Sequence, residues 1–344
     1  MYKISVIIPV YNVANYIVRC IESVIKQDTE KVQIECILID DCSPDDSIEV
    51  AKKFLDSYEG SVRFLFIYHE KNLGQSAARN NGIRSASGDY LFFLDSDDRL
   101  ETDAFSKMVN ELERCPYADI IEGYYMYMKD GNIYPGKPRP LFLYGKQEIL
   151  DKLYMNKVSA LACNKLINRK LIIDNSLFFV EGIIYEDIQW TNRLYHCISS
   201  VVIIPYITYI YEYNPSSTSN SSIRNATNAV NSFSTVICSF LDCETDIVYV
   251  SHKIFIFHYI LMAMDIQKRG HVDEQAIARL STVKKRLLYK VIKDGRLILS
   301  IFFLLMFRPF SFLFNYSFFR HHIHEMEHGV AFVANKMDWI HSLC

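Results

Sequence analysis

Two carboxylates that stand two residues apart are the first candidates for chemistry. Asp95 and Asp97 directly follow the apolar run Leu91–Leu94. Hard oxygen ligands of this kind suit Mg²⁺ or Mn²⁺, which binds a few carboxylates and completes its shell with phosphate oxygens and water. Acidic residues that cap a helix beginning near residue 103 would give the same pattern. The spacing alone therefore leaves a metal site and a helix start both open.

A second acidic pair, Glu186 and Asp187, occurs later in the chain. Adjacent carboxylates raise each other's proton affinity, and a carboxylate that binds a proton more readily can serve as a general base. Because Ile188–Trp190 continues with helical character, an acidic helix N-terminus stabilised by the helix dipole is the alternative.

The elements that must position these groups alternate between two hydrophobic periods. Short β-branched or aromatic runs are separated by helix-like stretches at about 13–27, 45–58 and 75–87; the runs are Ser5–Ile8, Ile34–Ile39, Arg63–Tyr68 and Tyr90–Leu94. Apolar runs spaced by helices indicate βαβ units and a mostly parallel sheet flanked by helices on both faces. Within the second helix-like stretch, Ser43 is expected to be the N-cap and Pro44 the first helical residue.

In a doubly wound sheet of this type the ligand binds beyond the carboxyl ends of the strands, where the strand order reverses. The polar or aromatic residues after the expected strands are Pro9, Tyr11, Asn12, Asp40, Asp41, Asp95, Asp97 and Asp98. The chain has neither a Gly-x-Gly-x-x-Gly fingerprint nor a P-loop, which disfavours dinucleotide and P-loop functions.

The pattern beyond residue 100 is mixed. We expect a helix near 103–113, a strand near 118–128, a hairpin at Lys129–Asn132, a polar loop over Asn214–Ser222 and helices to about residue 296. The expected organisation is a first α/β half over 1–100, a second half over 101–217, a helical extension over 218–296 and an aromatic tail over 297–344.

The composition of the chain excludes some classes of function but does not indicate an activity. Lys and Arg number 37 against 40 Asp and Glu, a net charge of −3, which excludes a globally basic nucleic-acid binder. Nine cysteines without a Cys-x-x-Cys pair fit free thiols in a reducing compartment. The apolar stretch Ile4–Val10 is broken by Pro9 and fits a first strand better than a signal peptide, so we expect a cytoplasmic protein.

Four motifs in order and spacing resemble the family 2 inverting glycosyltransferases of GT-A fold. They are Ser5–Asn12, Asp40–Ser47, Asn72–Gly82 and the pair Asp95 and Asp97. Asn164–Leu166 and Glu181–Asp187 look like the acceptor-side motifs of the capsule and lipopolysaccharide branch, so the resemblance covers roughly residues 3–217. The second motif usually carries Gly where this chain has Cys42.

The resemblance makes 1–100 the nucleotide-sugar-binding half and 101–217 the acceptor and catalytic-base half, and it implies a role for each motif residue. Tyr11 would flank the base of a nucleotide diphosphate sugar, and Asp41 would accept a hydrogen bond from that base. Asp97 would bind a Mn²⁺ or Mg²⁺ cofactor, while Asp95 would hold the ribose or the metal. Arg79 would orient the acidic cluster, unless it is only a structural helix arginine. The remaining residues expected at the donor site are Pro9, Asn12, Asp40, Asn72 and Ser96.

The same resemblance makes Asp187 the general base, with Glu186 beside it. The implied reaction moves a sugar, expected from UDP-hexose or UDP-N-acetylhexosamine, to a hydroxyl of a growing, lipid-linked surface glycan. Two alternatives stay open: a non-catalytic nucleotide-sugar-binding or scaffolding subunit, and a processive synthase, whose Gln-x-x-Arg-Trp motif is represented here only by Gln189 and Trp190.

The C-terminal region carries two further signals. His324–His328 matches the His-Glu-x-x-His pattern of zinc proteases, but we expect polar residues of a surface helix there. Basic residues over 284–296 lead into the broken aromatic segment 297–320, which fits an interfacial anchor on anionic lipid at the inner face of the cell membrane. A buried helical hairpin or a homo-oligomer contact is the alternative.

Overall fold

The computed structural model describes residues 1–27, 30–129, 132–135, 140–155, 157–215, 225–243 and 250–293. It divides into two compact units. The first comprises Met1–Ile149, Ala160–Gly182 and Glu186–Ser217, and the second comprises Leu150–Ser159, Ile183–Tyr185 and the chain from Thr218 onward. The aromatic segment 297–320 and the motif His324–His328 lie outside the described residues.

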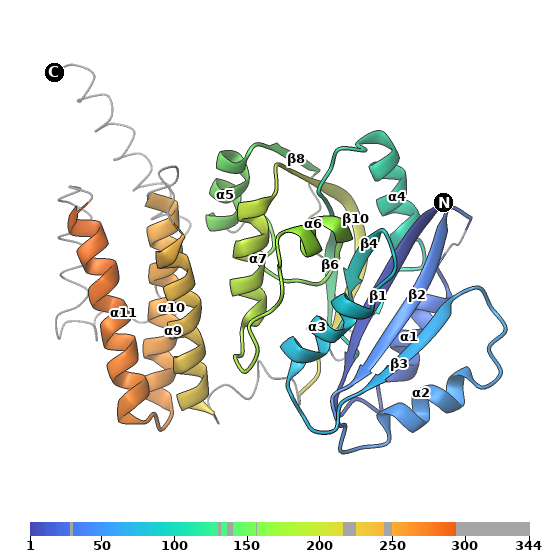
Figure 1. Cartoon of the computed structure of the whole chain (residues 1–344), viewed down its shortest axis with the longest axis horizontal. Helices are drawn as coiled ribbons and strands as arrows, with labels where there is room; N and C mark the ends of the chain where they lie inside the picture. The colour runs from blue at the N-terminus through green and yellow to red at the C-terminus, as the bar shows by residue number, and fades with distance from the viewer. Residues whose placement is uncertain are drawn as a thin grey trace. The chain divides into compact units, whose positions relative to one another are not determined.

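The four N-terminal strands form the parallel half of one mixed sheet, as the sequence predicted. They are β1 (Tyr2–Val10), β2 (Val32–Asp40), β3 (Arg63–Tyr68) and β4 (Tyr90–Phe93), and they lie in the order β3-β2-β1-β4 (Figure 1). The chain builds outward from β1 to β3 and then returns to the other side of β1. The strand order therefore reverses between β1 and β4, which is where a crevice opens in such sheets.

Helices cover both faces of the sheet because consecutive residues of its central strands β1 and β4 are apolar and buried. Ile4, Val6 and Ile8 lie in the same buried core as residues of α1 (Ile17–Ile25), α2 (Ser47–Leu55) and α4 (Ala104–Arg114). Ile7 points to the opposite face, beneath α3 (Gln75–Ser85). A Cβ on Gly82 of α3 would lie 2.3 Å from a methyl carbon of Ile7, so only glycine lets this helix pack so closely on β1.

The rest of the sheet continues in the order β4-β9-β6-β10-β5, with β7 paired to β6 and β8 to β10. These strands are β5 (Arg99–Leu100), β6 (Ile120–Lys129), β7 (Asn132–Pro135), β8 (Leu141–Tyr144), β9 (Lys165–Asn168) and β10 (Ser200–Glu212). The accompanying helices are α5 (Lys146–Tyr154), α6 (Arg169–Asp174) and α7 (Glu186–Cys197). Lys129 pairs with Asn132 across β6 and β7, which confirms the expected antiparallel pairing.

The expected start of α2 is wrong by one turn. The helix begins at Ser47, and its N-cap is Asp46 rather than Ser43. The Ser43 hydroxyl instead accepts a hydrogen bond from the Asn12 main-chain N at 2.7 Å. Ser43 therefore joins the loops after β1 and β2, while the Ser47 N at the helix start donates to Asp45 Oδ1 at 3.2 Å.

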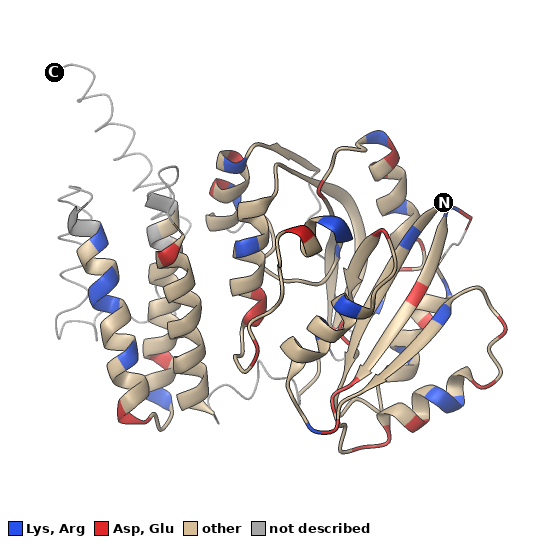
Figure 2. Ribbon diagram, viewed as in Figure 1, with Lys and Arg blue, Asp and Glu red and all other residues tan. Residues whose placement is uncertain are grey.

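Within the described residues beyond 225, the second unit consists mainly of helices, as expected: α9 (Ala226–Asp242), α10 (Val250–Arg269) and α11 (Glu274–Lys293). Lys and Arg recur along α11 (Figure 2). Two of them are engaged with α9: Arg286 forms an ion pair with Asp242 at 2.6 Å, and Lys290 contacts the Leu241 carbonyl. Leu287 is fully buried, so this part of the basic stretch is a packed helix.

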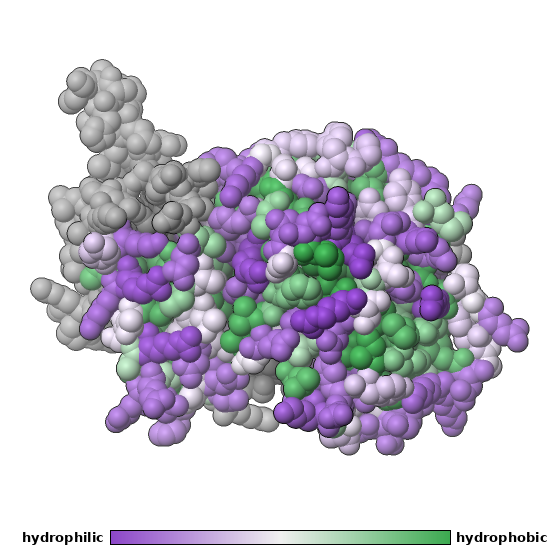
Figure 3. All heavy atoms as spheres, in the orientation of Figure 1, coloured by the Kyte–Doolittle hydropathy of each residue, from purple (hydrophilic) through white to green (hydrophobic). Residues whose placement is uncertain are grey.

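Ile183–Tyr185 also belongs to the helical unit. The Ile184 main-chain N donates to Ser232 Oγ at 3.1 Å, and the Tyr185 ring stacks on Phe233 with centroids 4.3 Å apart. Among the described helices none is long and apolar enough to span a bilayer. On the face that Figure 3 shows, hydrophobic residues form separate patches among hydrophilic ones.

Candidate functional site

The candidate site lies at the carboxyl ends of β1, β2 and β4. The pairing of β1 with β4 ends at Ile7 and Phe93, and Leu94 N donates to the Ile7 carbonyl at 3.1 Å. Pro9 is buried two residues further along β1, and it lacks the N–H that would continue this ladder. Pro9 therefore stands where β1 and β4 separate.

The loops after β1 and β2 are held in unusual backbone conformations. Asn12 and Cys42 both have φ of 56°, in the left-handed region that favours glycine. Asn tolerates this region, whereas Cys does so at a cost. Cys42 thus adopts the backbone conformation for which the related motif uses Gly. Tyr11, 46% exposed, leaves its ring available to a planar ligand.

Asp41 is buried, and its carboxylate organises the loop after β3. Its Oδ1 lies 2.7 Å from His69 Nδ1 and accepts from Leu73 N at 2.8 Å, while Oδ2 accepts from Gly74 N at 2.8 Å. A carboxylate has about four acceptor positions, so one remains for a ligand. Asp40 accepts from Ser43 N through Oδ1 at 2.9 Å. Asn72 is exposed on the loop after β3.

Arg79 joins carboxylates that are far apart in the sequence. This α3 side chain is 1% exposed. Its Nη2 lies 2.8 Å from Asp95 Oδ1, and its Nη1 lies 2.8 Å from Glu186 Oε1 and 2.6 Å from Asp187 Oδ1. Burial alone would lower the pKa of Arg79, but the charges of Asp187, Asp95 and Glu186 together raise it. The guanidinium is a permanent cation between the two acidic motifs.

The two carboxylates at the start of α7 hold protons more readily than free acids. Burial, with the Asp187 charge added, raises the pKa of Glu186 to about 7. Burial also raises the pKa of Asp187, although Arg79 opposes the shift. Asp187 Oδ2 accepts from Ala162 N at 3.3 Å. A carboxylate in this state can accept a proton near neutral pH.

Aromatic packing fixes α7 beneath this pair. The Trp190 indole stacks on Phe179 with centroids 4.5 Å apart and an interplanar angle of 10°, and Phe93 packs edge-on against both rings. Trp190 Nε1 donates to the Leu177 carbonyl at 2.8 Å. Asn80, next to Arg79, binds both main-chain groups of Phe179. The sequence did not predict this support, in which α3 and β4 hold α7.

The acidic turn after β4 comprises Asp95–Asp98. Gln75 Nε2 donates to Asp95 Oδ1 at 3.0 Å, and Asn214 Nδ2 donates to Asp97 Oδ2 at 2.9 Å. Ser96 is buried between the two acids. Burial, with the Asp95 charge added, raises the pKa of Asp97. Asp95 and Asp97 both keep carboxylate oxygens that could bind a ligand.

Asp98 differs from its neighbours because it faces inward. It is 1% exposed, accepts from the Tyr209 hydroxyl at 2.7 Å, and accepts from Glu212 N at 2.9 Å. Both donors come from β10, so this strand fixes the turn from behind. Burial raises the pKa of Asp98 well above its ordinary value, and the charges of Asp97 and Asp95 add to the shift.

A divalent cation fits the donor chemistry of the turn. Within the described residues no group of three or more His, Cys, Asp or Glu is arranged to hold a metal ion. Mg²⁺ and Mn²⁺ sites of nucleotide-binding enzymes need only one or two carboxylates, with phosphate oxygens and water supplying the other ligands. Asp97 and Asp95 are the residues that would hold such an ion.

The structure thus brings Arg79, Asp95, Glu186 and Asp187 into one cluster, with Asp97 in the same turn as Asp95. Pro9, Tyr11, Asn12, Asp40, Asp41 and Asn72 lie at the neighbouring strand ends. Sequence patterns alone do not identify Gln75, His69, Tyr209 or Asn214 as site residues. Asn214 closely follows β10, so a strand predicted over residues 200–212 would have been the signal that finds it.

Comparison with known proteins now identifies the family. The profile described as Glycosyl transferase family 2 matches residues 5–175. Glycosyltransferase GlyG of Streptococcus pneumoniae is 31% identical over 218 residues, which is 60% of this chain and 70% of GlyG. The chain belongs to glycosyl transferase family 2.

Two other relatives extend the likeness. The cholesterol galactosyltransferase of Borreliella burgdorferi is 29% identical over 56% of this chain, and the chain spans 55% of its length. The crystal structure of Staphylococcus aureus TarS residues 1–349 with UDP-GlcNAc superimposes with a TM-score of 0.65 at 18% identity, covering 83% of this chain and 80% of that one. This likeness confirms the mixed α/β fold followed by helices.

Proposed function

We propose that this glycosyltransferase inverts the anomeric centre as it moves a sugar from a nucleotide diphosphate sugar to an acceptor hydroxyl. The observation that carries the proposal is the Arg79 cluster, which brings Asp187 beside Asp95 although 92 positions separate them in the numbering. A donor whose diphosphate lies at the Asp95–Asp97 turn would have its sugar close to Asp187. Direct displacement requires a base at that point.

The step balances without a further reactant. The acceptor oxygen forms a bond to the anomeric carbon as the bond from that carbon to the diphosphate oxygen breaks, and the nucleoside diphosphate leaves with the electron pair. Asp187 takes the hydroxyl proton. Its raised pKa suits this task, because a carboxylate with a higher pKa is a stronger base for the hydroxyl proton.

Donor binding follows from the strand-end loops. The Tyr11 ring would flank the base, and Asp41 would accept a hydrogen bond from it at the acceptor position that the loop leaves free. Asp97 and Asp95 would hold Mg²⁺ or Mn²⁺, which would offset the charge of the leaving diphosphate. Asn12, Asp40, Asn72 and Ser96 shape the loops around these groups.

The donor class we propose is a UDP-hexose or UDP-N-acetylhexosamine. One relative is named as a galactosyltransferase, and the TarS structure contains UDP-GlcNAc. The acceptor we propose is a growing, lipid-linked surface glycan, in line with the capsule and polysaccharide branch of the family.

A donor panel tests the activity without knowledge of the acceptor. UDP-glucose, UDP-galactose and their N-acetyl forms would each be incubated with the enzyme and Mn²⁺ or with EDTA, and UDP release measured. We expect slow hydrolysis of one donor that stops with EDTA. Donor binding without UDP release, even with an acceptor extract, would instead support the non-catalytic subunit.

We also propose that the region 284–320 holds the enzyme at the inner face of the cell membrane. Arg286 and Lys290 are engaged with α9, so the lipid contact would depend on Lys285, which is exposed, and on the residues beyond 293. A chain truncated after Arg296 keeps α11 whole. We expect it to leave the membrane fraction, and unchanged fractionation with the full-length protein would contradict the anchor.

A further inference from the structure

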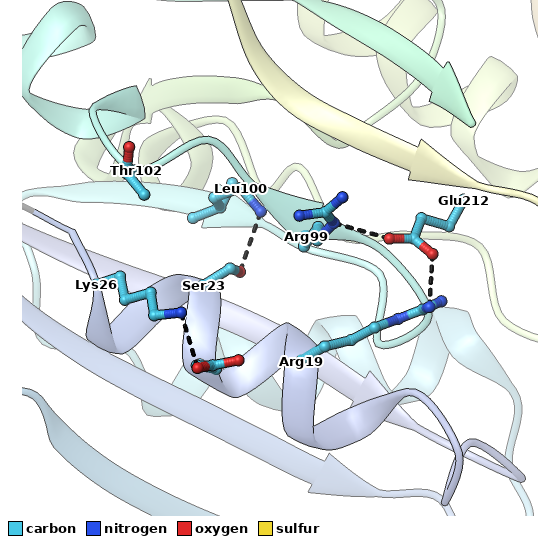
Figure 4. Close-up of a pocket in the computed structure, with 8 residues that line it drawn as sticks. Arg19, Ser23, Lys26, Arg99, Leu100, Thr102 and Glu212 are labelled. Atoms are coloured by element: carbon cyan, nitrogen blue, oxygen red, sulfur yellow. Dashed lines mark hydrogen bonds and ion pairs between the residues drawn. The ribbon is translucent and has the colours of Figure 1, made fainter. Parts of the chain in front are cut away.

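A cavity of about 360 Å³ lies beside the acidic turn and is not used by the proposed reaction. Its walls come from α1, β5 and the end of β10 (Figure 4). Ser23 Oγ accepts from Leu100 N at 3.0 Å and so fastens β5 to α1. The volume falls within the range of small-molecule sites, about 300–1,000 Å³.

The cavity is lined by more positive than negative groups. Arg19, Lys26 and Arg99 are the cations, and Glu22 and Glu212 are the two carboxylates. Lys26 pairs with Glu22 at 2.7 Å on the same helical edge. One carboxylate, that of Glu212, therefore serves both guanidinium groups, which leaves an excess of one positive charge.

Glu212 occupies the position that an incoming anion would take. Its Oε2 lies 2.6 Å from Arg19 Nη1, and its Oε1 lies 2.7 Å from Arg99 Nε, so the carboxylate bridges the two arginines (Figure 4). Within the described residues, Arg19 Nε is buried without a hydrogen-bond partner. Both arginine side chains are about one third exposed, so the cavity can be reached from solvent.

The cavity is also connected to the acidic turn. Arg19 Nη2 donates to the Asp97 carbonyl at 3.2 Å, and the Glu212 main-chain N donates to Asp98 Oδ1. The second bond uses the main chain, so the Glu212 side chain can leave the arginines without releasing Asp98.

We propose that this cavity binds a phosphomonoester between Arg19 and Arg99, in competition with the Glu212 carboxylate. Guanidinium groups recognise phosphate through paired, charge-assisted hydrogen bonds. A phosphomonoester carries a charge of about −1.5 to −2 at neutral pH and offers three acceptor oxygens, which matches the two guanidinium groups better than one carboxylate does.

Titration calorimetry with glycerol 3-phosphate, with glycerol as the uncharged control, tests the site in the full-length protein. We expect saturable binding of glycerol 3-phosphate only. Arg99→Gln should weaken it about tenfold, as loss of a charge-assisted hydrogen bond does, whereas Glu212→Gln should tighten it about threefold or more by removing the competing carboxylate. Arg114→Gln, at a 75% exposed side chain, should leave it within about twofold.

Weaker binding to Arg99→Gln together with tighter binding to Glu212→Gln would place the ligand in this cavity. A phosphate bound at the donor site would produce neither effect. If Arg99→Gln does not fold, Arg99→Lys is the second variant. It keeps the positive charge but lacks the paired N–H donors of the guanidinium, so it should still weaken binding. Absence of saturable binding in both wild type and Glu212→Gln, or binding that no cavity variant changes, would overturn the proposal. The readout is binding, so it is independent of whether the enzyme transfers a sugar.

Discussion

The Asp95–Asp98 turn and the Glu186–Asp187 pair share Arg79 but are held in different ways. Neutral donors support the turn: Gln75 and Asn214 bind its outer acids, and β10 binds Asp98. The pair at the start of α7 depends on one guanidinium and one amide N–H. The turn is therefore preorganised by contacts that do not depend on Arg79 alone, whereas the pair depends mainly on that one cation.

The largest expected effect on stability is at Arg79, on which both clusters depend. Arg79→Ala leaves buried carboxylates without their cation, which typically costs about 3–5 kcal/mol. Urea unfolding would measure this loss. Arg84→Ala on the exposed side of the same helix is the control, with an expected loss below about 1 kcal/mol. Equal stability of the two variants would show that Arg79 does not hold the clusters together.

The second prediction separates ligand binding from structure within the turn. Asp97→Ala should abolish metal-dependent binding of UDP, because it removes the carboxylate that we assign to the cation. Calorimetry with UDP and Mn²⁺, repeated with EDTA, would test it. Asp103→Ala, at an exposed carboxylate, is the control. Unchanged affinity that still responds to the metal would refute this role.

Asp98 should behave in the opposite way to Asp97. Asp98→Ala leaves the Tyr209 hydroxyl and Glu212 N without their acceptor, which costs about 1–3 kcal/mol for a buried donor. Asp97→Ala should cost less, because Asp97 is partly exposed. Urea unfolding of both variants gives the comparison, and a larger loss for Asp97→Ala would reverse our assignment.

A further expected effect concerns the pH dependence of stability at the pair. Folding raises the pKa of Glu186 from 4.5 to about 7, so between these values the folded protein binds a proton that the unfolded chain has released. This residue's contribution to stability is therefore present at low pH and is lost as the pH rises through 7. The Glu186→Gln variant replaces this carboxyl with an amide, which does not titrate in this pH range.

The free energy of unfolding of Glu186→Gln, relative to wild type, should accordingly rise between pH 5 and pH 7.5. Glu113→Gln, at an exposed carboxylate, should show little such change. If the difference in unfolding free energy between Glu186→Gln and wild type did not change across this pH range, Glu186 would be ionised throughout it.

The sequence predicted the parallel strands and the acidic strand ends because these depend on local periodicity. Residue spacing could not predict that Arg79 joins Asp95 to Glu186, because 107 positions separate Arg79 from Glu186. The role expected for Arg79 came from the family resemblance alone. The prediction of Ser43 as the helix N-cap was wrong. The Ser43 hydroxyl instead accepts a hydrogen bond from Asn12 N, which is distant in sequence. Local patterns thus located the strand ends, and tertiary contacts determined which side chains meet there.

The asymmetry between the two acidic clusters is tested most directly by Asp187→Asn, with UDP-sugar affinity and turnover measured on the same preparation. We expect turnover to fall by about 10²–10⁴, the usual contribution of a general base, while donor affinity stays within about twofold. Asp174→Asn at an exposed carboxylate is the control. Wild-type turnover in Asp187→Asn would contradict its assignment as the base.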